Sequence, residues 1–465
     1  MRTWSNASNW ARQVPGTTHA GRRRLTAALV GMVALVLMPI AAAAQCANFI
    51  RDDEIESLLQ SYAGPILDAA GLGSQAVRIR ILKAKPFNAF VLDGRNIFVN
   101  SGTLVDAETA NEVIGVIAHE TGHIAGGHLA SKRAKIQGDL TRNLLMKVLG
   151  IGAVIAGAAS GQDTTAGAGQ SILSGSDAVT MRSILLYSRT LEAQADQAAL
   201  RFLDRTGQSA RGMITTFERL STSGFNGDRY LLSHPLPQDR INNLVQAAEK
   251  SPHFRKVDTP EVQLRHDLMR AKLRGYIDKP QIVFNTYPNS DQTLPARYAR
   301  AIATARLGST EKALALVDAL IAENPTWPFF HELKGDVYMR ANQPGPALAP
   351  LRKALQLLPK SNLIRVELAH ALLRTNDRGV LDEAIKLLQQ GLVGEDNAFG
   401  YLQLANAYYL KGEEGSAALA TAEARLYQCQ WQEARAFAKR AQALLKTGTP
   451  AWIRADDIAN MQPPS

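Results

Sequence analysis

AHETGHIAGGH, residues 118–128, places three histidines and one glutamate within eleven residues. Positions four apart lie on the same face of an α-helix, so His119 and His123 can reach one ion with Glu120 beside them. Zinc prefers nitrogen ligands, and a catalytic zinc lowers the pKa of a water whose proton a nearby carboxylate accepts. The HExxH spacing therefore predicts zinc ligands at His119 and His123 and a general base at Glu120.

The residues before the motif predict the helix that this interpretation needs. Asp106 is the expected N-cap, acidic residues follow, and positions 113, 114, 116 and 117 are apolar. On such a half-buried helix, unpartnered His and Glu side chains would be costly. The context therefore favours a metal site over a helix that carries surface histidines.

The third ligand has to come from elsewhere. A metzincin motif requires its third histidine at position 129, which is Leu129, so His128 is interpreted as a polar residue near the helix end. Downstream, YSRTLEAQAD (187–196) places Glu192 and Asp196 on one face of a second helix. We predict that Glu192 is a ligand and that Asp196 forms a hydrogen bond with a ligand imidazole.

Three blocks together resemble a known family. HETGH (119–123), YSRTLEAQAD (187–196) and SHPLPQDRI (233–241) are similar to the HtpX-like and CAAX-protease-like zinc metallopeptidases, which are gluzincins. The similarity is greatest to their periplasmic branch that carries tetratricopeptide repeats (TPRs). The resemblance implies one zinc ion per chain, bound by the two motif histidines and Glu192, with Glu120 as the general base.

The third block adds two candidate catalytic residues. The resemblance implies that His234 lies near the zinc, either as a latch in the open coordination position or as an aid to the transition state, with Arg240 in the same block. A capped turn before a helix is the alternative interpretation of this block. The family often has glutamate at the position of Gln194, a difference of little expected consequence because this residue is not a ligand.

The first residues read as a secretory signal. Residues 20–46, AGRRRLTAALVGMVALVLMPIAAAAQC, combine a basic cluster, an apolar core and small residues. We expect a signal peptide over 1–44, cleaved after Ala44, and a periplasmic protein; a later start or an uncleaved anchor is the alternative. In an oxidising compartment Cys46 and Cys429 either form a disulfide or remain free thiols.

The charge gives no indication of a nucleic-acid partner. The formal net charge is +10, and residues 1–44 hold five arginines and no acidic residue, which leaves +5 for the mature chain. This mild excess is not the footprint of a nucleic-acid-binding protein.

Residues 45–255 are expected to form the metallopeptidase domain, an α+β fold that is mostly helical with a small sheet. A helix is predicted over 52–63, a strand over 77–85, and a hairpin over 88–102 that turns at Asp93-Gly94. Residues 95–100 are our candidate edge strand, which either pairs with an extended substrate or only covers the zinc helix.

A glycine-rich segment separates the two ligand helices. Residues 148–160 are apolar but too few to span a bilayer, and the residues up to 179 are rich in Gly, Ser, Thr and Ala. We expect a lid over the cleft in preference to a segment that contacts the membrane surface.

The remainder reads as an all-α TPR solenoid. Residues 256–295 are expected to be a helical linker, 296–447 the repeats and 448–465 a tail. Helical segments recur about every 34 residues, with matching small residues at Ala313, Ala347, Ala384 and Ala418. Stacked repeats form a concave surface suited to protein partners.

These features together predict a secreted zinc endopeptidase with a partner-binding repeat domain. The family resemblance implies that its substrates are misfolded or stalled envelope proteins, in particular outer-membrane β-barrels, and that the repeats meet the β-barrel assembly machinery. Two alternatives stay open. One is a periplasmic chaperone or assembly adaptor whose zinc site is held silent by His234, and the other is a scaffold whose metal is structural.

Overall fold

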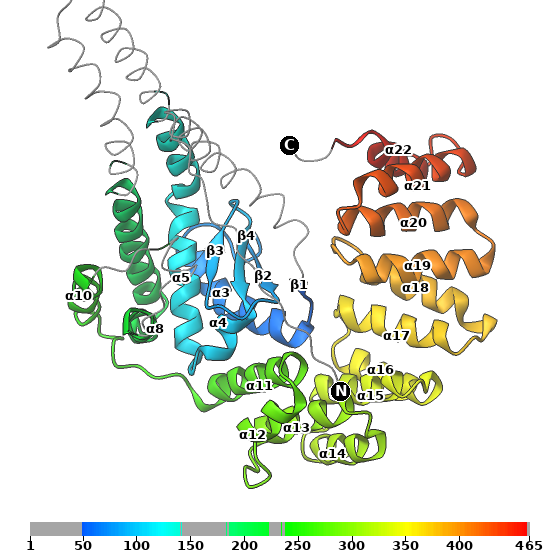
Figure 1. The fold of residues 1–465 in the computed structure, drawn as a ribbon, viewed down its shortest axis with the longest axis horizontal. Coiled ribbons are helices and arrows are strands. Elements are labelled where there is room, and N and C mark those ends of the chain that lie inside the picture. Colours follow the sequence, from blue (N-terminus) through cyan, green and yellow to red (C-terminus); the bar gives the residue numbers. More distant parts are fainter. Residues whose placement is uncertain are drawn as a thin grey trace, which may run out of the picture. The chain divides into compact units, whose positions relative to one another are not determined.

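The computed structural model describes residues 49–139, 141, 183, 186–222, 234 and 238–462. They form an α+β region with one four-stranded sheet, followed by a long all-helical region (Figure 1). This confirms the predicted α+β domain with a helical C-terminal region. Among the described residues, no helix is long and apolar enough to cross a membrane. The predicted signal peptide and the predicted lid lie outside the described residues.

The HETGH motif lies on a central helix, α5 (Ala110–Ala125). Its N-cap is Thr109, whose side chain accepts a hydrogen bond from the backbone N–H of Glu112. The prediction of Asp106 as N-cap is wrong, because Asp106 instead ends a separate short helix, α4 (Ser101–Asp106). Nearly every residue of α5 up to His123 is buried, as expected of a helix with neighbours on all sides.

Four strands form the sheet that lies beside α5. They are β1 (Phe49–Ile50), β2 (Arg78–Leu82), β3 (Ala89–Val91) and β4 (Asn96–Asn100), in the order β1-β2-β4-β3. Strands β3 and β4 are antiparallel, as the hairpin prediction requires, while β2 and β4 are parallel. Because β4 is paired on both sides, residues 95–100 are not an edge strand, and that expectation is wrong; β3 lies at the edge.

Helices surround α5 and complete the core of the α+β region. Helix α3 (Asp53–Ala69), helix α8 (Arg211–Thr222) and strand β3 pack against α5, and α10 (Gln238–Ala248) packs against α8. Further helical residues extend over 128–139 and 186–205. The second of these segments carries Glu192.

Two glycines let neighbouring helices approach α5 closely. A Cβ atom at Gly122 would lie 2.7 Å from the carbonyl oxygen of Ala195, in the helix that carries Glu192. A Cβ atom at Gly115 would lie 2.6 Å from the Cβ of Met213 on α8. Glycine at these positions therefore sets the short distance between the helices that bear the site.

The C-terminal region is a succession of helices in which each packs against the next (Figure 1). After α11 (Pro260–Ile277) and α12 (Pro280–Thr286) come α13 (Leu294–Arg306), α14 (Thr310–Glu323), α15 (Pro328–Arg340), α16 (Pro344–Leu357), α17 (Asn362–Arg374), α18 (Leu381–Gly391), α19 (Ala398–Lys411), α20 (Glu414–Tyr427), α21 (Trp431–Leu444) and α22 (Pro450–Asn460). A short 3-10 helix, Arg378–Val380, precedes α18. Helix α22 falls within the segment 448–465.

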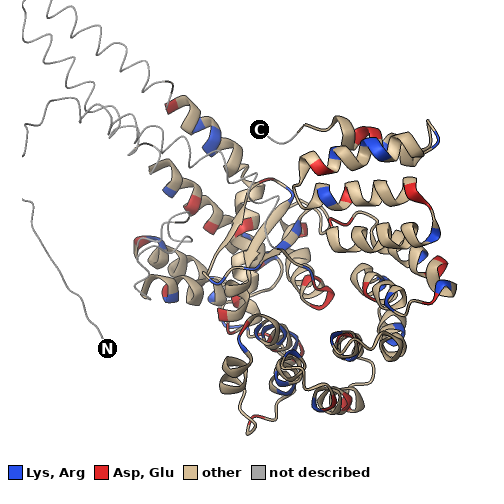
Figure 2. Ribbon diagram, turned by 45° about the vertical axis from the view of Figure 1, so that its right-hand side comes forward, with Lys and Arg blue, Asp and Glu red and all other residues tan. Residues whose placement is uncertain are grey.

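The four alanines of the repeat pattern lie on alternate helices, α14, α16, α18 and α20, and all are buried. Surface ion pairs join neighbouring helices, as between Arg297 and Glu323 at 2.5 Å and between Lys334 and Asp318 at 2.6 Å. Figure 2 shows basic and acidic residues interspersed over these helices. Exposed pairs of this kind add little to stability, so the apolar contacts hold the helices together.

Helix α11 links the two regions through a buried cation. Lys272 Nζ lies 2.7 Å from Asp52 Oδ2 before α3, and 3.2 Å from both Glu54 Oε2 and Glu332 Oε2 on α15. The Tyr298 hydroxyl donates a hydrogen bond to Glu54 at 2.9 Å. The first turn of α3 is therefore in direct contact with the helices that follow α11.

The predicted cysteine pair is only partly described. Cys429 is not a free thiol in the structure. Cys46 lies outside the described residues, so its pairing with Cys429 stays a prediction.

Candidate metal centre

Two of the predicted ligands face each other on α5. The Nε2 atoms of His119 and His123 lie 3.2 Å apart, and their rings meet edge to face. His119 is fully buried and His123 nearly so. The i, i+4 spacing on a helix thus delivers the two imidazole nitrogens to one point.

Glu192 reaches the same point from the helix over 186–205. Its Oε2 lies 3.3 Å from His119 Nε2, and its Oε1 lies 3.5 Å from His123 Nε2. The close approach at Gly122 places this helix within reach of α5. The structure thus brings together all three residues that the sequence predicts as ligands.

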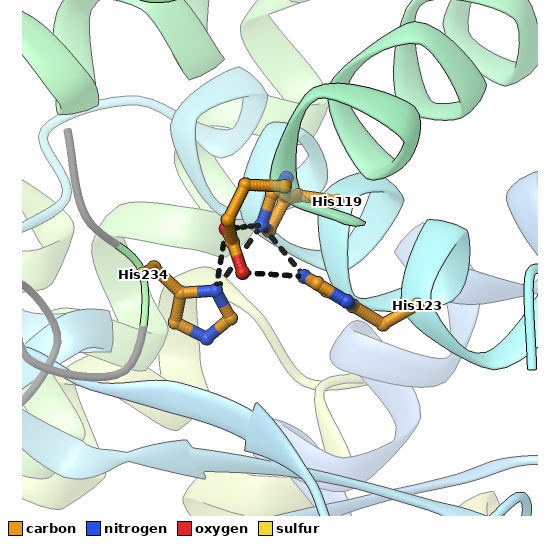
Figure 3. A group of neighbouring side chains, drawn as sticks. His119, His123 and His234 are labelled. Atoms are coloured by element: carbon orange, nitrogen blue, oxygen red, sulfur yellow. Dashed lines mark hydrogen bonds and ion pairs between the residues drawn. The ribbon is translucent and has the colours of Figure 1, made fainter. Parts of the chain in front are cut away.

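His234 joins them from the segment before α10. Its Nδ1 lies 2.9 Å from Glu192 Oε2 and 3.4 Å from His119 Nε2. One ligand atom from each of His119, His123, Glu192 and His234 lies within 4.8 Å of the others, and all four residues are buried. Figure 3 shows the three histidine rings converging.

Asp196 and Arg240 contact the ligand residues but are not themselves in the group of ligand atoms. Asp196 Oδ1 lies 3.0 Å from Nδ1 of His119, the nitrogen that faces away from the cluster. The Arg240 guanidinium donates from Nε to Asp196 Oδ2 at 2.5 Å, and its Nη1 lies 3.1 Å from Glu192 Oε2. Asp196 thus lies beside a ligand imidazole, its hydrogen bond to that ring stays a prediction, and Arg240 contacts both carboxylates.

The pKa values follow from these contacts. Burial raises the pKa of the Glu192 carboxyl, but His234, His119 and His123 outweigh burial and hold it well below its usual range. Burial lowers the pKa of His119, while Asp196 and Glu192 more than offset this and raise it to about 9. The Glu192 carboxylate is therefore ionised, as a metal ligand must be.

The donor set fits a metal ion such as zinc. Two imidazole nitrogens and a carboxylate converge, and His234 offers a further nitrogen. Both carboxylate oxygens of Glu120 are buried without a hydrogen-bond partner among the described residues, and His234 Nε2 lies 3.7 Å from Oε1. Such a carboxylate is suited to accept a proton from a water molecule beside the ligands.

The sequence of this region matches a known family. Residues 50–248 match the model of peptidase family M48, and this range contains every residue of the cluster. The chain carries a peptidase family M48 domain.

Relatives extend the match beyond the M48 domain. The beta-barrel assembly-enhancing protease of Escherichia coli strain K12 is 23% identical over 431 residues, which cover 88% of this chain and 83% of that protein. The putative beta-barrel assembly-enhancing protease of Vibrio cholerae is 26% identical over 397 residues, which cover 81% of this chain and 77% of that protein. Metalloprotease LoiP of E. coli K12 is 33% identical over 150 residues, 32% of this chain and 54% of that protein.

Sequence reasoning missed two residues of the M48 domain that pack against the cluster. Phe217 on α8 is fully buried, with its ring 5.7 Å from the His119 ring and the Arg240 guanidinium 5.2 Å from its centre. His128 is 5% exposed, and its Nδ1 lies 3.1 Å from Nδ1 of His123. Phe217 looks like any apolar helix residue in the sequence, whereas the glycine pair before His128 was an available signal.

Proposed function

We propose that this protein is a zinc-dependent endopeptidase of the periplasm that degrades misfolded or stalled envelope proteins. The convergence of His119, His123 and Glu192 beside the buried carboxylate of Glu120 carries the proposal. A structural zinc needs no adjacent base, so this arrangement favours catalysis over a structural metal.

Each residue of the cluster has a proposed role. His119, His123 and Glu192 would hold one zinc ion, which would supply Lewis acidity and lower the pKa of a water molecule. Glu120 accepts the proton of that water and passes it to the leaving amine. Asp196 fixes the ring of His119, and Arg240 holds Asp196 and Glu192 in place.

His234 is proposed to regulate the site. Its Nδ1 lies among the ligand atoms, 3.4 Å from His119 Nε2, where a further protein ligand would exclude the attacking water. In a resting, latched enzyme His234 occupies this position, and it withdraws when a substrate enters. The same contact favours the alternative function, a chaperone or assembly adaptor whose metal site stays silent.

The helical C-terminal region is proposed to be a TPR solenoid that recruits partners. Its helices repeat with a spacing of about 34 residues and bury the same small residue in each unit, which supports this proposal. The relatives named beta-barrel assembly-enhancing proteases support substrates among outer-membrane β-barrel proteins and a partner in the machinery that assembles them.

Cleavage of an unfolded outer-membrane β-barrel protein tests the proposal. We expect slow cleavage by wild type and faster cleavage by His234→Ala. The cleavage rate of Glu120→Gln should be lower than that of wild type by at least about 100-fold, although this variant retains its zinc. Glu108→Gln, which changes an exposed glutamate just before α5, serves as the matched control and should cut at the wild-type rate.

Zinc content, measured in every variant, separates loss of chemistry from loss of the metal. If wild type, His234→Ala and Glu120→Gln are equally inert while all bind the substrate, the peptidase proposal fails and the chaperone takes its place. If His234→Ala cuts no faster than wild type, the latch is not part of the mechanism.

A further inference from the structure

His119 and His123 on α5 each have a second ring nitrogen, Nδ1, that faces away from the other ligand atoms. Different residues contact these two nitrogens. The outward nitrogen of His119 lies 3.0 Å from a carboxylate oxygen of Asp196. The outward nitrogen of His123 instead lies 3.1 Å from Nδ1 of His128, with the two rings nearly perpendicular at 83°. His128 thus has a defined partner in the site, although it is outside the group of ligand atoms.

The chain is shaped to turn His128 back onto His123. Helix α5 ends at Ala125 with Gly126 as its C-cap, and Gly127 adopts the left-handed conformation with φ of +61°, which few residues other than glycine adopt readily. A Cβ atom at Gly126 would overlap the imidazole of His128, so only glycine leaves room for the ring. The glycine pair therefore both reverses the chain and accommodates the ring.

The ring nitrogen of His123 that would bind the metal determines which of His123 and His128 donates the hydrogen bond between them. His123 directs Nε2 toward His119 and Glu192, so a metal bound there leaves the proton on Nδ1. The Nδ1–H of His123 faces Nδ1 of His128. His128 Nδ1 must therefore accept this hydrogen bond, so the proton of the His128 ring lies on Nε2.

We propose that His128 is a positioning residue that accepts the Nδ1–H of His123 and thereby fixes the tautomer and orientation of this ligand. This inference rests on the proposed zinc site. His119 and His123 are thus held by an anionic and a neutral acceptor, respectively.

Two nearly isosteric substitutions test the role of the acceptor atom. Asparagine at position 128 keeps an oxygen where Nδ1 of the imidazole lies, and leucine keeps the shape without an acceptor. We expect His128→Leu to weaken zinc binding about 10- to 100-fold, measured by competition with a chromophoric chelator, and His128→Asn to stay within about threefold of wild type. The melting temperatures of the zinc-free proteins should agree, which separates positioning from folding.

A third variant displaces the ring without changing it. Gly126→Ala adds a methyl group where the His128 ring lies, and we expect it to weaken zinc binding as His128→Leu does. His370→Leu is the matched control, because His370 lies on α17, pairs with Gln403 at 2.8 Å, and should leave zinc affinity unchanged.

The outcomes are distinguishable. Wild-type zinc affinity in His128→Leu, or equal weakening in His128→Leu and His128→Asn, would overturn the positioning role and leave the proposed peptidase intact. A wild-type protein that binds no zinc would overturn both proposals.

Discussion

At the scale of single residues, Asp196 has two partners, the outward nitrogen of His119 and the guanidinium of Arg240. Asp196→Asn keeps the size but removes the charge, so we expect zinc affinity to fall about 10- to 100-fold. Chelator competition measures this change. Asp204→Asn, at an exposed position of the same helix, should bind zinc like wild type; if both variants bind equally well, Asp196 does not support the ligand.

The spacing of polar residues on helices predicted much of the candidate site. His119, His123, Glu192 and Asp196 were identified because each pair lies four residues apart, which fixes a common face whatever the tertiary fold. His128 was placed at a helix end, because helix periodicity cannot anticipate a glycine turn that folds the chain back. Contacts that depend on the tertiary fold, like that of Phe217, leave no such pattern.

At the scale of elements, the approach of the two ligand helices depends on Gly122. A methyl group there would lie 2.7 Å from the carbonyl oxygen of Ala195 and push the helix of Glu192 away from α5. We expect Gly122→Ala to lower the free energy of unfolding by about 1–3 kcal/mol and to weaken zinc binding. Denaturant unfolding of the zinc-free protein measures the first effect.

A second glycine provides the control for that experiment. Gly138 lies in the helix over 128–139, and a Cβ atom there meets nothing within 4 Å. Gly138→Ala should therefore be neutral or stabilising by up to about 1 kcal/mol, because alanine favours the helix. Unchanged stability and zinc affinity in Gly122→Ala would show that the helices adapt without loss.

The sequence patterns identified the elements better than their arrangement. The hairpin over 88–102 was predicted because its turn lies between two apolar runs, yet the pattern does not say which of its strands pairs with β2. For this reason residues 95–100 were expected at the edge of the sheet, where β3 lies instead. The N-cap was misplaced because Asp106 and Thr109 are both good caps, and the choice depends on the turn after α4.

At the scale of the whole molecule, Lys272 faces more carboxylates than it can neutralise. Burial raises the pKa of Glu332 from 4.5 to about 8, with Lys272 opposing this effect. A raised carboxyl pKa contributes stability that is complete below 4.5 and lost as the pH rises through about 8. We expect the free energy of unfolding to fall as the pH rises between these two values.

Glu332→Gln should flatten that pH dependence and stabilise the protein at the alkaline end, because the neutral amide carries no charge to bury. Thermal melting at a series of pH values measures both effects. Glu311→Gln, at an exposed position on α14, is the matched control and should follow wild type. If the two variants melt alike at every pH, the buried carboxylate is not the source of the dependence.

The same junction constrains how this protein can evolve. Asp52 caps α3 and also contacts Lys272, while Glu54 in the first turn of that helix meets Tyr298 and the Trp327 indole. The start of the peptidase fold is therefore completed by side chains that the chain supplies more than two hundred residues later. An exchange of the helices after α11 for those of another protein would keep this junction only where the incoming helices carried matching residues, so the two regions can be replaced independently only at the cost of these contacts.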